Sequence, residues 1–450
     1  MAENNERRHL NMQENLTRGS VKRLYFRYLG ASFGSAMLSC VYGMVDAAVV
    51  GQYHGPQGAA ALSVVMPIWT ILYSLGLLIG IGGSVNYSYF KAQGKPEKAN
   101  AYFTLSLILT SLVSILCWVG ITVFQEPMLR LFGADDALLQ LAKEYLKPIQ
   151  FVIPAYPFTQ FLAAFLRNDN APGRATLATI AGGVLNMVGD IFFVFVLDMG
   201  IRGAGLATAL GCSLSVLLML THFGTKKNTL KLSRIYGHIH KTRLVTANGF
   251  SPFLSDLAMG VVSVLFNRQI MAYLDSDALA VFGMIVQVTC FVQCSTYGVG
   301  QASQPLLSAN YGIKRWDRIR QTENYALWTS VAMGVVSTAL MLLIPNTLVR
   351  LFMSPTESVL QIAPGILRVY GLAYLTLPVN IFATYYFPSV GQPGKATTVS
   401  IARGIALCGI LVFVLPWFFG GNAIWWVMPV TETVVGSYTL ISMKIRKNAP

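Results

Sequence analysis

The sequence predicts an all-α polytopic membrane protein whose twelve transmembrane helices form two homologous six-helix lobes. Of its 450 residues, 54% are hydrophobic and 12% are charged, about half the charged fraction of an ordinary soluble domain. Long apolar runs, each able to cross a hydrocarbon core of ~30 Å, separate the charged segments. A backbone in lipid must satisfy its own hydrogen bonds, so these runs are expected to be helices. The predicted spans are 28–50, 58–90, 100–124, 145–167, 175–197, 203–223, 246–273, 278–310, 322–344, 364–390, 396–419 and 422–443.

An internal duplication predicts the two lobes. Three motifs recur in the second half of the chain in the same order and at nearly one displacement, which indicates two homologous halves. The first half carries two polar residues, Asn186 and Asp190, where the second half has Leu407 and Leu411. The halves therefore share a scaffold but differ in their polar residues, and this asymmetry points to function. The matching motifs are Gly80-Ile-Gly82 with Gly298-Val-Gly300, Arg130-Leu-Phe132 with Arg350-Leu-Phe352, and Pro172-Gly-Arg-Ala-Thr176 with Pro393-Gly-Lys-Ala-Thr397.

The distribution of positive charge predicts the topology. With the N-terminus inside, the inner segments hold 25 Lys and Arg residues and the outer segments hold five. This bias is typical of cytoplasmic loops, so both termini are expected in the cytoplasm. The net charge of +14 is accordingly assigned to topology and anionic lipid, with no nucleic-acid partner expected. The polar first 20 residues lack the apolar core of a cleavable signal peptide.

One long basic stretch divides the chain. We expect the segment 233–240 within it to form a surface helix on the inner leaflet. The outer segments 125–143 and 345–363 are each expected to form a short surface helix before the fourth and the tenth span. The predicted parts are a cytoplasmic tail (1–20), an N-terminal lobe (21–223), a basic linker (224–245), a C-terminal lobe (246–443) and a second tail (444–450).

Prolines and cysteines inside the spans give less evidence about function than the motifs above. Pro157 and Pro378 occupy equivalent positions in the two halves. They suit helix breaks beside a cavity, and the general frequency of proline in membrane helices explains them equally well. All six cysteines lie in apolar spans, and Cys290 and Cys294 share one helix face. With no histidine nearby, we expect them to be packing residues rather than metal ligands.

Four acidic residues fall within the spans: Asp46, Asp190, Asp256 and Glu432. A carboxylate at mid-bilayer costs about 2.5–3.5 kcal/mol on insertion scales, so each needs a physical reason. Such a group can bind and release a proton, or bind a cation when it is ionised. We favour this function for Asp46 and Asp190 over a structural hydrogen bond. Both interpretations stay open for Asp256, and a structural role is favoured for Glu432.

The residues around these acids suggest a binding site for a hard cation. Asn186 and Asp190 are four residues apart and therefore share a face of the fifth span, as Tyr42 and Asp46 do on the first. Thr208 adds a hydroxyl from the sixth span. Carboxylate, amide and hydroxyl oxygens suit Na⁺ and equally suit a hydrogen-bonded proton. The sequence leaves the choice between the two ions open.

Several segments, taken in order, resemble the MATE (multidrug and toxic compound extrusion) family. The resemblance runs from about residue 20 to residue 445 and is greatest to bacterial members. The segments that carry it are Val45-Asp46 with Gly51, Phe165-Leu-Arg-Asn-Asp-Asn-Ala-Pro-Gly-Arg174, Leu185-Asn186 with Asp190, Gly203-Ala-Gly-Leu-Ala-Thr208, Gly298-Val-Gly-Gln-Ala-Ser-Gln-Pro305 and Asn310-Tyr-Gly312.

The resemblance implies a V-shaped fold with a central cavity that opens alternately to the two sides of a bacterial inner membrane. It implies a monomer, not an enzyme, that exports cationic amphipathic drugs in exchange for H⁺ or Na⁺ and needs no other cofactor. The coupling site it implies in the N-terminal lobe comprises Asp46, Asn186, Asp190 and Thr208, with Tyr42 and Tyr145 nearby.

Other positions match the family less closely. Gln160 stands where some relatives carry asparagine, and Asp256 matches a seventh-span carboxylate that other branches use. The first span lacks the proline that bends it in some relatives. Gln287 and Gln293 on the eighth span are candidates for substrate contact, with interhelical hydrogen bonds as the alternative.

Three other functions fit the sequence less well. A lipid-linked saccharide flippase of the same superfamily is the main alternative, but it needs a cationic cavity and only Arg268, Arg368 and Arg403 lie inside spans. An intramembrane enzyme is disfavoured because no HExxH, GxSxG or Ser/Lys constellation lies at a plausible depth in the membrane. A channel is disfavoured because no filter-like segment is repeated.

Overall fold

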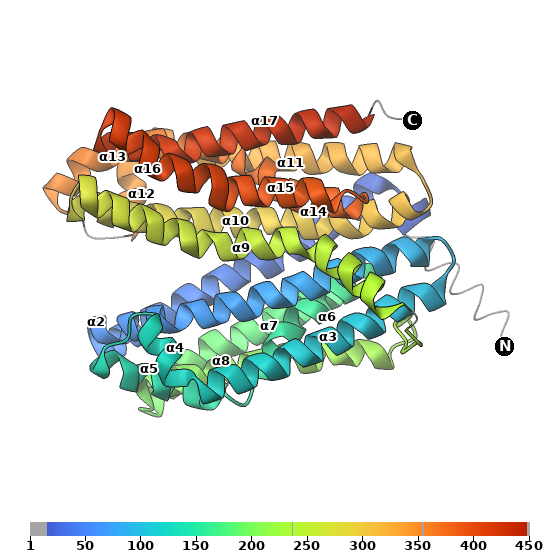
Figure 1. The fold of residues 1–450 in the computed structure, drawn as a ribbon. Coiled ribbons are helices and arrows are strands. Elements are labelled where there is room, and N and C mark those ends of the chain that lie inside the picture. The colour runs from blue at the N-terminus through green and yellow to red at the C-terminus, as the bar shows by residue number, and fades with distance from the viewer. Residues whose placement is uncertain (1–15, 236, 353–354, 448–450) are drawn as a thin grey trace.

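The computed structural model describes residues 16–235, 237–352 and 355–447, and here the chain forms two helical bundles that lie side by side (Figure 1). The first bundle opens with a long helix, α2 (Val21–Ala92), which supplies two spans because it breaks at Gly55, where φ is 64° and ψ is −154°. Glycine adopts this positive φ without the strain that a side chain would cause. The other helices of this lobe are α3 (Pro96–Val123), α4 (Gln125–Leu131), α5 (Asp136–Ile149), η1 (Ile153–Ala155), α6 (Tyr156–Asn168), α7 (Pro172–Ile191), η2 (Phe192–Val196), α8 (Gly200–Leu220) and η3 (Thr221–Gly224).

The second bundle repeats this order of helices. Its members are α9 (His238–Tyr273), α10 (Ser276–Gly312), α11 (Trp316–Leu343), α12 (Pro345–Phe352), α13 (Glu357–Gly371), η4 (Leu372–Leu375), α14 (Leu377–Ser389), α15 (Pro393–Ile401), η5 (Ala402–Ala406), α16 (Leu407–Phe419), η6 (Gly421–Trp426) and α17 (Val427–Lys447).

The predicted twelve-helix, two-lobe architecture is confirmed. Among the described residues, ten helices are long and apolar enough to cross a membrane, and the bent pair α5 and α6 makes an eleventh. The twelfth is α17, whose 21 residues include the polar Thr431, Glu432 and Thr433 and which is therefore less apolar. The predicted breaks are also present, because α6 and α14 begin with Pro157 and Pro378 in their first turns. Proline fits a first turn because its missing N–H has no partner there.

The linker differs from the prediction, because residues 225–235 form no helix. Two backbone N–H groups near the end of this stretch bond to side chains of α3. Lys231 N donates to Asn100 Oδ1 at 3.1 Å, and Ser233 N donates to Thr104 Oγ1 at 2.9 Å. The surface helix expected over 233–240 is thus wrong, and α9 begins at His238. Most of the predicted N-terminal tail, residues 1–15, and residues 448–450 of the C-terminal tail lie outside the described residues.

Asp169 anchors this extended linker to the N-terminal lobe. It accepts hydrogen bonds from Lys91 Nζ at 2.6 Å, from the backbone N of Thr229 at 2.9 Å and from the Thr229 hydroxyl, and it lies 2.8 Å from His222 Nε2. Burial alone would raise the pKa of Asp169. The charge of Lys91 and these hydrogen bonds outweigh burial, so the pKa lies well below its usual range. Asp169 therefore stays ionised and joins α2, η3 and the linker.

The outer segments also differ in detail. Each was expected to be one short surface helix. The segment 125–143 instead contains α4 and the first half of α5, and 345–363 contains α12 and the start of α13. The axis of α5 is bent by 68° from the following segment 153–168. This bend turns α5 toward α8 and brings Tyr145 into the interior of the lobe.

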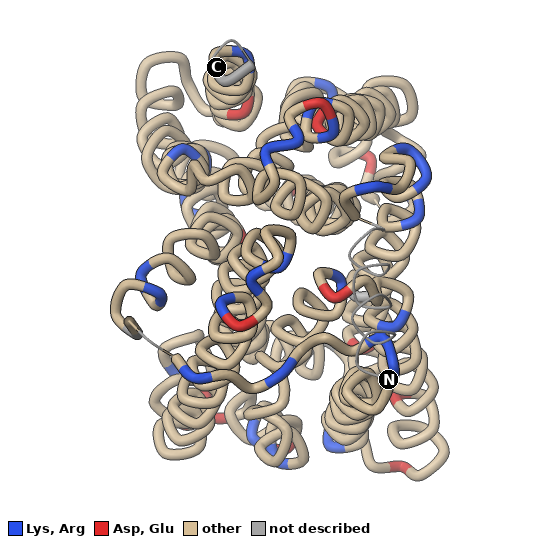
Figure 2. The backbone as a smooth tube through the Cα atoms, turned by 90° about the vertical axis from the view of Figure 1, so that its right-hand side faces the viewer, with Lys and Arg blue, Asp and Glu red and all other residues tan. Residues whose placement is uncertain are grey.

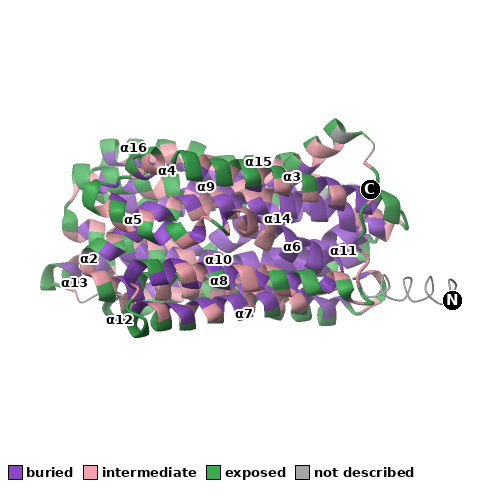
Figure 3. Cartoon of the chain, turned by 90° about the horizontal axis from the view of Figure 1, so that it is seen from below, coloured by how far each residue is buried: buried purple, intermediate pink, exposed green. Residues whose placement is uncertain are grey.

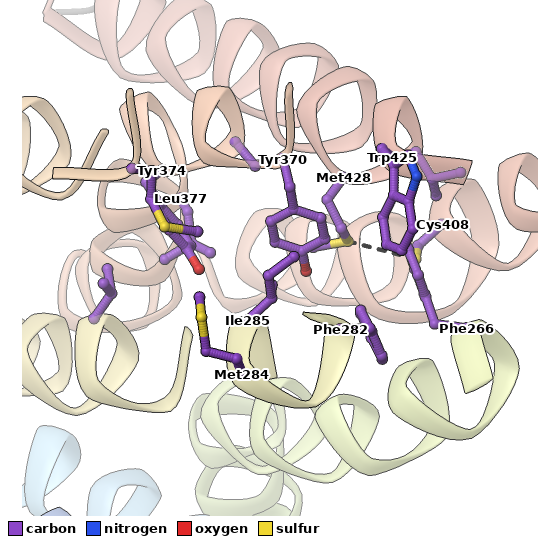
Figure 4. Close-up of a cluster of buried hydrophobic side chains, with 14 of the residues drawn as sticks. Phe266, Phe282, Met284, Ile285, Tyr370, Tyr374, Leu377, Cys408, Trp425 and Met428 are labelled. Atoms are coloured by element: carbon purple, nitrogen blue, oxygen red, sulfur yellow. Dashed lines mark hydrogen bonds between the residues drawn. The ribbon is translucent and has the colours of Figure 1, made fainter. Parts of the chain in front are cut away.

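Each lobe has its own apolar core, and the bundle surface is apolar as well. In the C-terminal lobe, Phe266 stacks on Phe282 with ring centroids 5.0 Å apart, and both lie near Tyr370 (Figure 4). Buried residues concentrate along the middle of the molecule and exposed ones along its periphery (Figure 3). Many exposed residues are large and apolar, such as Leu116 and Trp328, which are 70% and 75% exposed. A continuous apolar periphery fits a surface that faces lipid.

The two lobes are joined in the half of the molecule that holds the start of α2 and the end of α17. Among the described residues, the cross-lobe hydrogen bonds run from this end to the middle of the spans and no further. Asn168 Nδ2 donates to Gln304 Oε1 at 2.8 Å, and Gln304 Nε2 donates back to Asn168 Oδ1 at 3.1 Å. At mid-span, Ser74 Oγ donates to Asp256 Oδ2 at 2.6 Å. Beyond that level the lobes diverge, as seen at the left of Figure 1.

Candidate functional site

Close packing of α7 against α8 positions the polar residues of the N-terminal lobe. A Cβ atom added to Gly211 would lie 2.6 Å from the carbonyl oxygen of Gly182, and one added to Gly205 would lie 2.1 Å from the carbonyl oxygen of Tyr145. Only glycine permits such close backbone approach. One turn from the first contact, Asn186 faces Thr208. The second contact places Tyr145 of α5 at the same level.

A hydrogen-bonded chain links four helices at this point. The hydroxyl of Tyr145 donates to Asp46 Oδ2 at 2.9 Å and lies 3.3 Å from Thr208 Oγ1. Thr208 Oγ1 also accepts from Asn186 Nδ2 at 3.1 Å. The structure thus brings together Asp46, Asn186 and Thr208 as the sequence suggested. It places Tyr145, expected only nearby, at the centre of the group.

Four acceptor oxygens at this site have no hydrogen-bond donor among the described residues. They are Oδ1 of Asp46, Oδ1 of Asn186, and both carboxylate oxygens of Asp190. Asp190 lies one turn beyond Asn186 on α7 and is fully buried. Its carboxylate is close enough to Asp46 for the two charges to repel each other. Buried oxygens without donors are costly, and a bound cation or proton would satisfy the oxygens and relieve the repulsion.

Two further predicted residues line a pocket beside this group. Tyr42 and Gln160 line it together with Asn186 and Thr208. Five polar residues that were not predicted for this site also line it: Tyr156, Thr159, Thr179, Cys212 and Ser215. Helical spacing was a usable signal for some of them. Thr179 lies seven residues before Asn186, and Ser215 lies seven after Thr208, so each shares a helix face with a predicted residue.

The remaining predicted residues lie elsewhere. Asp256 does not join the cation group, because its two oxygens accept from Ser74 at 2.6 Å and from Tyr297 at 3.5 Å. Gln293 lines a separate pocket in the C-terminal lobe that includes Arg403. Gln287 is exposed and shares a face of α10 with Cys290 and Cys294. It therefore faces the space between the lobes, in the half where they diverge.

The C-terminal lobe holds a charge pair instead of free carboxylates. Arg403 Nε donates to Glu432 Oε1 at 2.6 Å, and Asn380 Nδ2 donates to Glu432 Oε2 at 2.7 Å. Arg403 occupies the position equivalent to Gly182, 221 residues earlier. The charge of Glu432 is thereby neutralised within the protein, in line with its expected structural role. Asp46 and Asp190, which have carboxylate oxygens without donors among the described residues, lie in the N-terminal lobe, so the two lobes differ in chemistry despite their common scaffold.

One substitution tests the helix contact that builds the site. Gly211→Val is expected to push α7 away from α8, because its side chain would meet the backbone of Gly182. Overpacking of this kind costs about 1–3 kcal/mol. A 1.4 kcal/mol loss in ion binding corresponds to about a tenfold lower affinity. We expect ion-driven transport to need about tenfold more ion, measured as the concentration dependence of transport in proteoliposomes.

Gly409→Val provides the matched control. A Cβ atom at Gly409 meets nothing within 4 Å, so transport by this variant should equal that of the wild type. Equal transport by the Gly211→Val and Gly409→Val variants would show that the α7–α8 contact does not position the site.

Comparisons with known proteins agree with this arrangement. A profile of the MatE family matches residues 31–192 and 253–419, one segment in each lobe. The multidrug export protein MepA of Staphylococcus saprophyticus subsp. saprophyticus is 26% identical over 403 residues, which cover 89% of this chain and 88% of that protein. MepA of Staphylococcus aureus strain MRSA252 is 23% identical over 403 residues, 88% of each chain.

Solved structures share the fold at lower identity. The outward-facing conformation of a multidrug resistance MATE family transporter of the MOP superfamily superposes with a TM-score of 0.88 at 19% identity, covering 96% of this chain and 97% of that one. A MOP superfamily transporter from Pyrococcus furiosus, described as having a binding pocket of reverse polarity, gives a TM-score of 0.86 at 20% identity with the same coverage. The two-segment profile match spans most of the chain, and we conclude that this protein belongs to the MatE family of membrane transporters.

Proposed function

We propose that this protein is a secondary active multidrug exporter that moves cationic amphipathic compounds out of the cell in exchange for H⁺ or Na⁺. The observation that carries the proposal is the set of four acceptor oxygens without donors on Asp46, Asn186 and Asp190. Oxygens of this kind bind a hard cation or a proton. The similarity to MepA proteins, which are multidrug exporters by name, supports drugs as the substrate class.

The proposed orientation places both termini in the cytoplasm of a bacterial cell, in the inner membrane. Figure 2 views the molecule from the end with the termini, where Lys and Arg outnumber Asp and Glu. Such an excess is typical of the cytoplasmic side. In this orientation the joined halves of the lobes close the cytoplasmic side, and the diverging halves open outward. We propose that the protein works as a monomer.

Ion binding drives the proposed transport cycle by changing the charge of the coupling site. In the outward-open state, an ion enters from outside and offsets one of the two negative charges of Asp46 and Asp190. Because their repulsion is then relieved, α2 and α7 can pack more closely, and this rearrangement weakens the binding of the cationic drug. The drug leaves outward, and the lobes then swing to open the cytoplasmic side and release the ion there.

The free energy for export comes from the concentration gradient of the coupled ion. Exchange of one H⁺ or Na⁺ for one monocationic drug moves no net charge, so the membrane potential does not drive it. A tenfold ion gradient supplies about 1.4 kcal/mol, which supports a tenfold substrate gradient. With one coupled ion per cycle, the ion gradient therefore sets the drug gradient that the protein can maintain.

Reconstituted transport tests the function and identifies the ion. Proteoliposomes that hold purified protein and ethidium are given either a pH gradient or a Na⁺ gradient, each with the other ion at equilibrium. We expect gradient-driven ethidium movement at least several-fold above that of liposomes without protein, under one gradient only. Movement under neither gradient, together with exchange of a diphosphate-linked lipid, would contradict drug antiport and favour a lipid flippase.

A further inference from the structure

Three cysteines from two lobes meet at the level where the lobes begin to diverge. Cys40 lies midway along the first span of α2, and Cys290 and Cys294 lie one turn apart at the middle of α10. The sulfur atoms of Cys40 and Cys290 are 3.9 Å apart. All three sulfur atoms lie within 4.8 Å of one another. The sequence placed Cys290 and Cys294 on one face but offered no reason to add Cys40 from 250 residues away.

The spacing of these sulfurs fits a single metal ion. A metal–thiolate bond is about 2.3 Å long, so three sulfurs arranged trigonally around one ion are about 4.0 Å apart. The observed separation of 3.9 Å between Cys40 and Cys290 matches this value. The three cysteines carry free thiols and are only partly buried. An ion can therefore reach the group without unfolding of the lobes.

The chemistry of the group selects a soft ion. Its ligand atoms are all sulfur, with no carboxylate or imidazole among them. A thioether lies on the same face of α2, because Met37 is one turn before Cys40 and its Sδ accepts a hydrogen bond from Ser295 Oγ at 3.0 Å. Thiolate and thioether ligands favour Cu(I) over hard ions such as Na⁺ or Mg²⁺. The group is thus unlike the oxygen-rich site on α7 and cannot replace it.

We propose that Cys40, Cys290 and Cys294 bind one soft monovalent metal ion of the Cu(I) class and that this ion fastens the two lobes together. Sulfur lone pairs form the bonds to the metal, and the displaced thiol protons pass to water. No electron is transferred, so neither an oxidant nor a reductant takes part.

Fastening the lobes has a consequence for transport that rests on the proposed function. The ion contacts α2 and α10 only while their midpoints touch, so it binds this conformation in preference to one where they separate. A ligand at 100 times its Kd stabilises its preferred state by about 2.7 kcal/mol, close to a hundredfold shift in population. Bound Cu(I) is therefore expected to arrest the cycle.

Competition for Cu(I) tests the site without any transport assay. Purified full-length protein in detergent, freshly reduced and kept anaerobic, is titrated against the Cu(I) complex of bathocuproine disulfonate. We expect one Cu(I) per chain, and X-ray absorption is expected to report three sulfur ligands at about 2.3 Å. Cys40→Ser should lower the affinity by at least a hundredfold. Cys117→Ser, which changes a partly buried cysteine on α3, should leave the affinity unchanged.

Two results would overturn the proposal. One is a Cu(I) affinity for the Cys40→Ser variant equal to that of the wild type, because the site would then not join the lobes. The other is an X-ray absorption spectrum of the wild type with fewer than three sulfurs, which needs no variant to fold. Wild-type protein that binds Cu(I) in this titration but moves no ethidium when it is free of metal would contradict the proposed export function, and the metal site would still be supported.

Discussion

Asp190→Asn is expected to abolish ion-driven export. The substitution removes a charge and the only fully buried carboxylate at the site, where both oxygens lack donors among the described residues. If the ion is H⁺, asparagine cannot take up the proton at all. If it is Na⁺, losing one opposite charge at about 4 Å costs about 4 kcal/mol at an effective dielectric constant of about 20. That cost weakens ion binding by about a thousandfold, and ethidium transport should fall to the level of liposomes without protein.

Asp198→Asn is the matched control for this experiment. Asp198 follows the same span, is exposed and accepts a hydrogen bond from Tyr53 at 2.5 Å. Its replacement makes the same chemical change outside the site, so transport should stay within twofold of the wild type. Asp46→Asn should behave like Asp190→Asn. Full transport by both site variants would remove the coupling role from the N-terminal lobe, and Asp256 would become the next residue to test.

Arg403→Met is expected to cause the largest loss of stability. Arg403 and Glu432 are both buried, with their charged atoms 2.6 Å apart. Removing one partner of a buried pair leaves an uncompensated charge, which typically costs 3–5 kcal/mol. We expect the variant to denature at a clearly lower temperature than the wild type, measured by thermal unfolding in detergent.

A double substitution separates the lost pair from the lost side chain. Arg403→Met combined with Glu432→Gln removes both charges, so it should recover most of the lost stability. Arg202→Met, at an exposed position outside the core, should have no effect. If the single and double variants unfold at the same low temperature, packing around Arg403 rather than charge pairing stabilises this part of the lobe.

The sequence predicted the elements of this fold well and their ends less well. Apolar runs long enough to cross a bilayer revealed all twelve helices, including α17, because lipid leaves the backbone no alternative to helix. The helix predicted in the linker was wrong, because the backbone N–H groups of residues 231 and 233 bond to side chains of α3. Whether these residues form a helix depends on which other helix lies beside the linker, and the local sequence contains no information about that neighbour.

The site shows the same division. The sequence alone singled out Asp46, Asn186 and Asp190, because polar groups in lipid need a reason and because the duplicated half has leucines at two of these positions. The family resemblance added Thr208 to the set. Only the tertiary structure decided that Tyr145 joins Asp46 to Thr208.

The tertiary structure also determined the bonding partners of residues that looked alike in the sequence. Asp256 resembled Asp46 but bonds to Ser74 of the opposite lobe, and Cys40 meets two cysteines of that lobe. The physical reason is the distance along the chain over which each effect acts. The polarity and periodicity of a segment depend on its own residues, and they determine whether it crosses the membrane and which groups are costly there. The partner that offsets each cost comes from a helix far away in the chain, and only packing brings the two together.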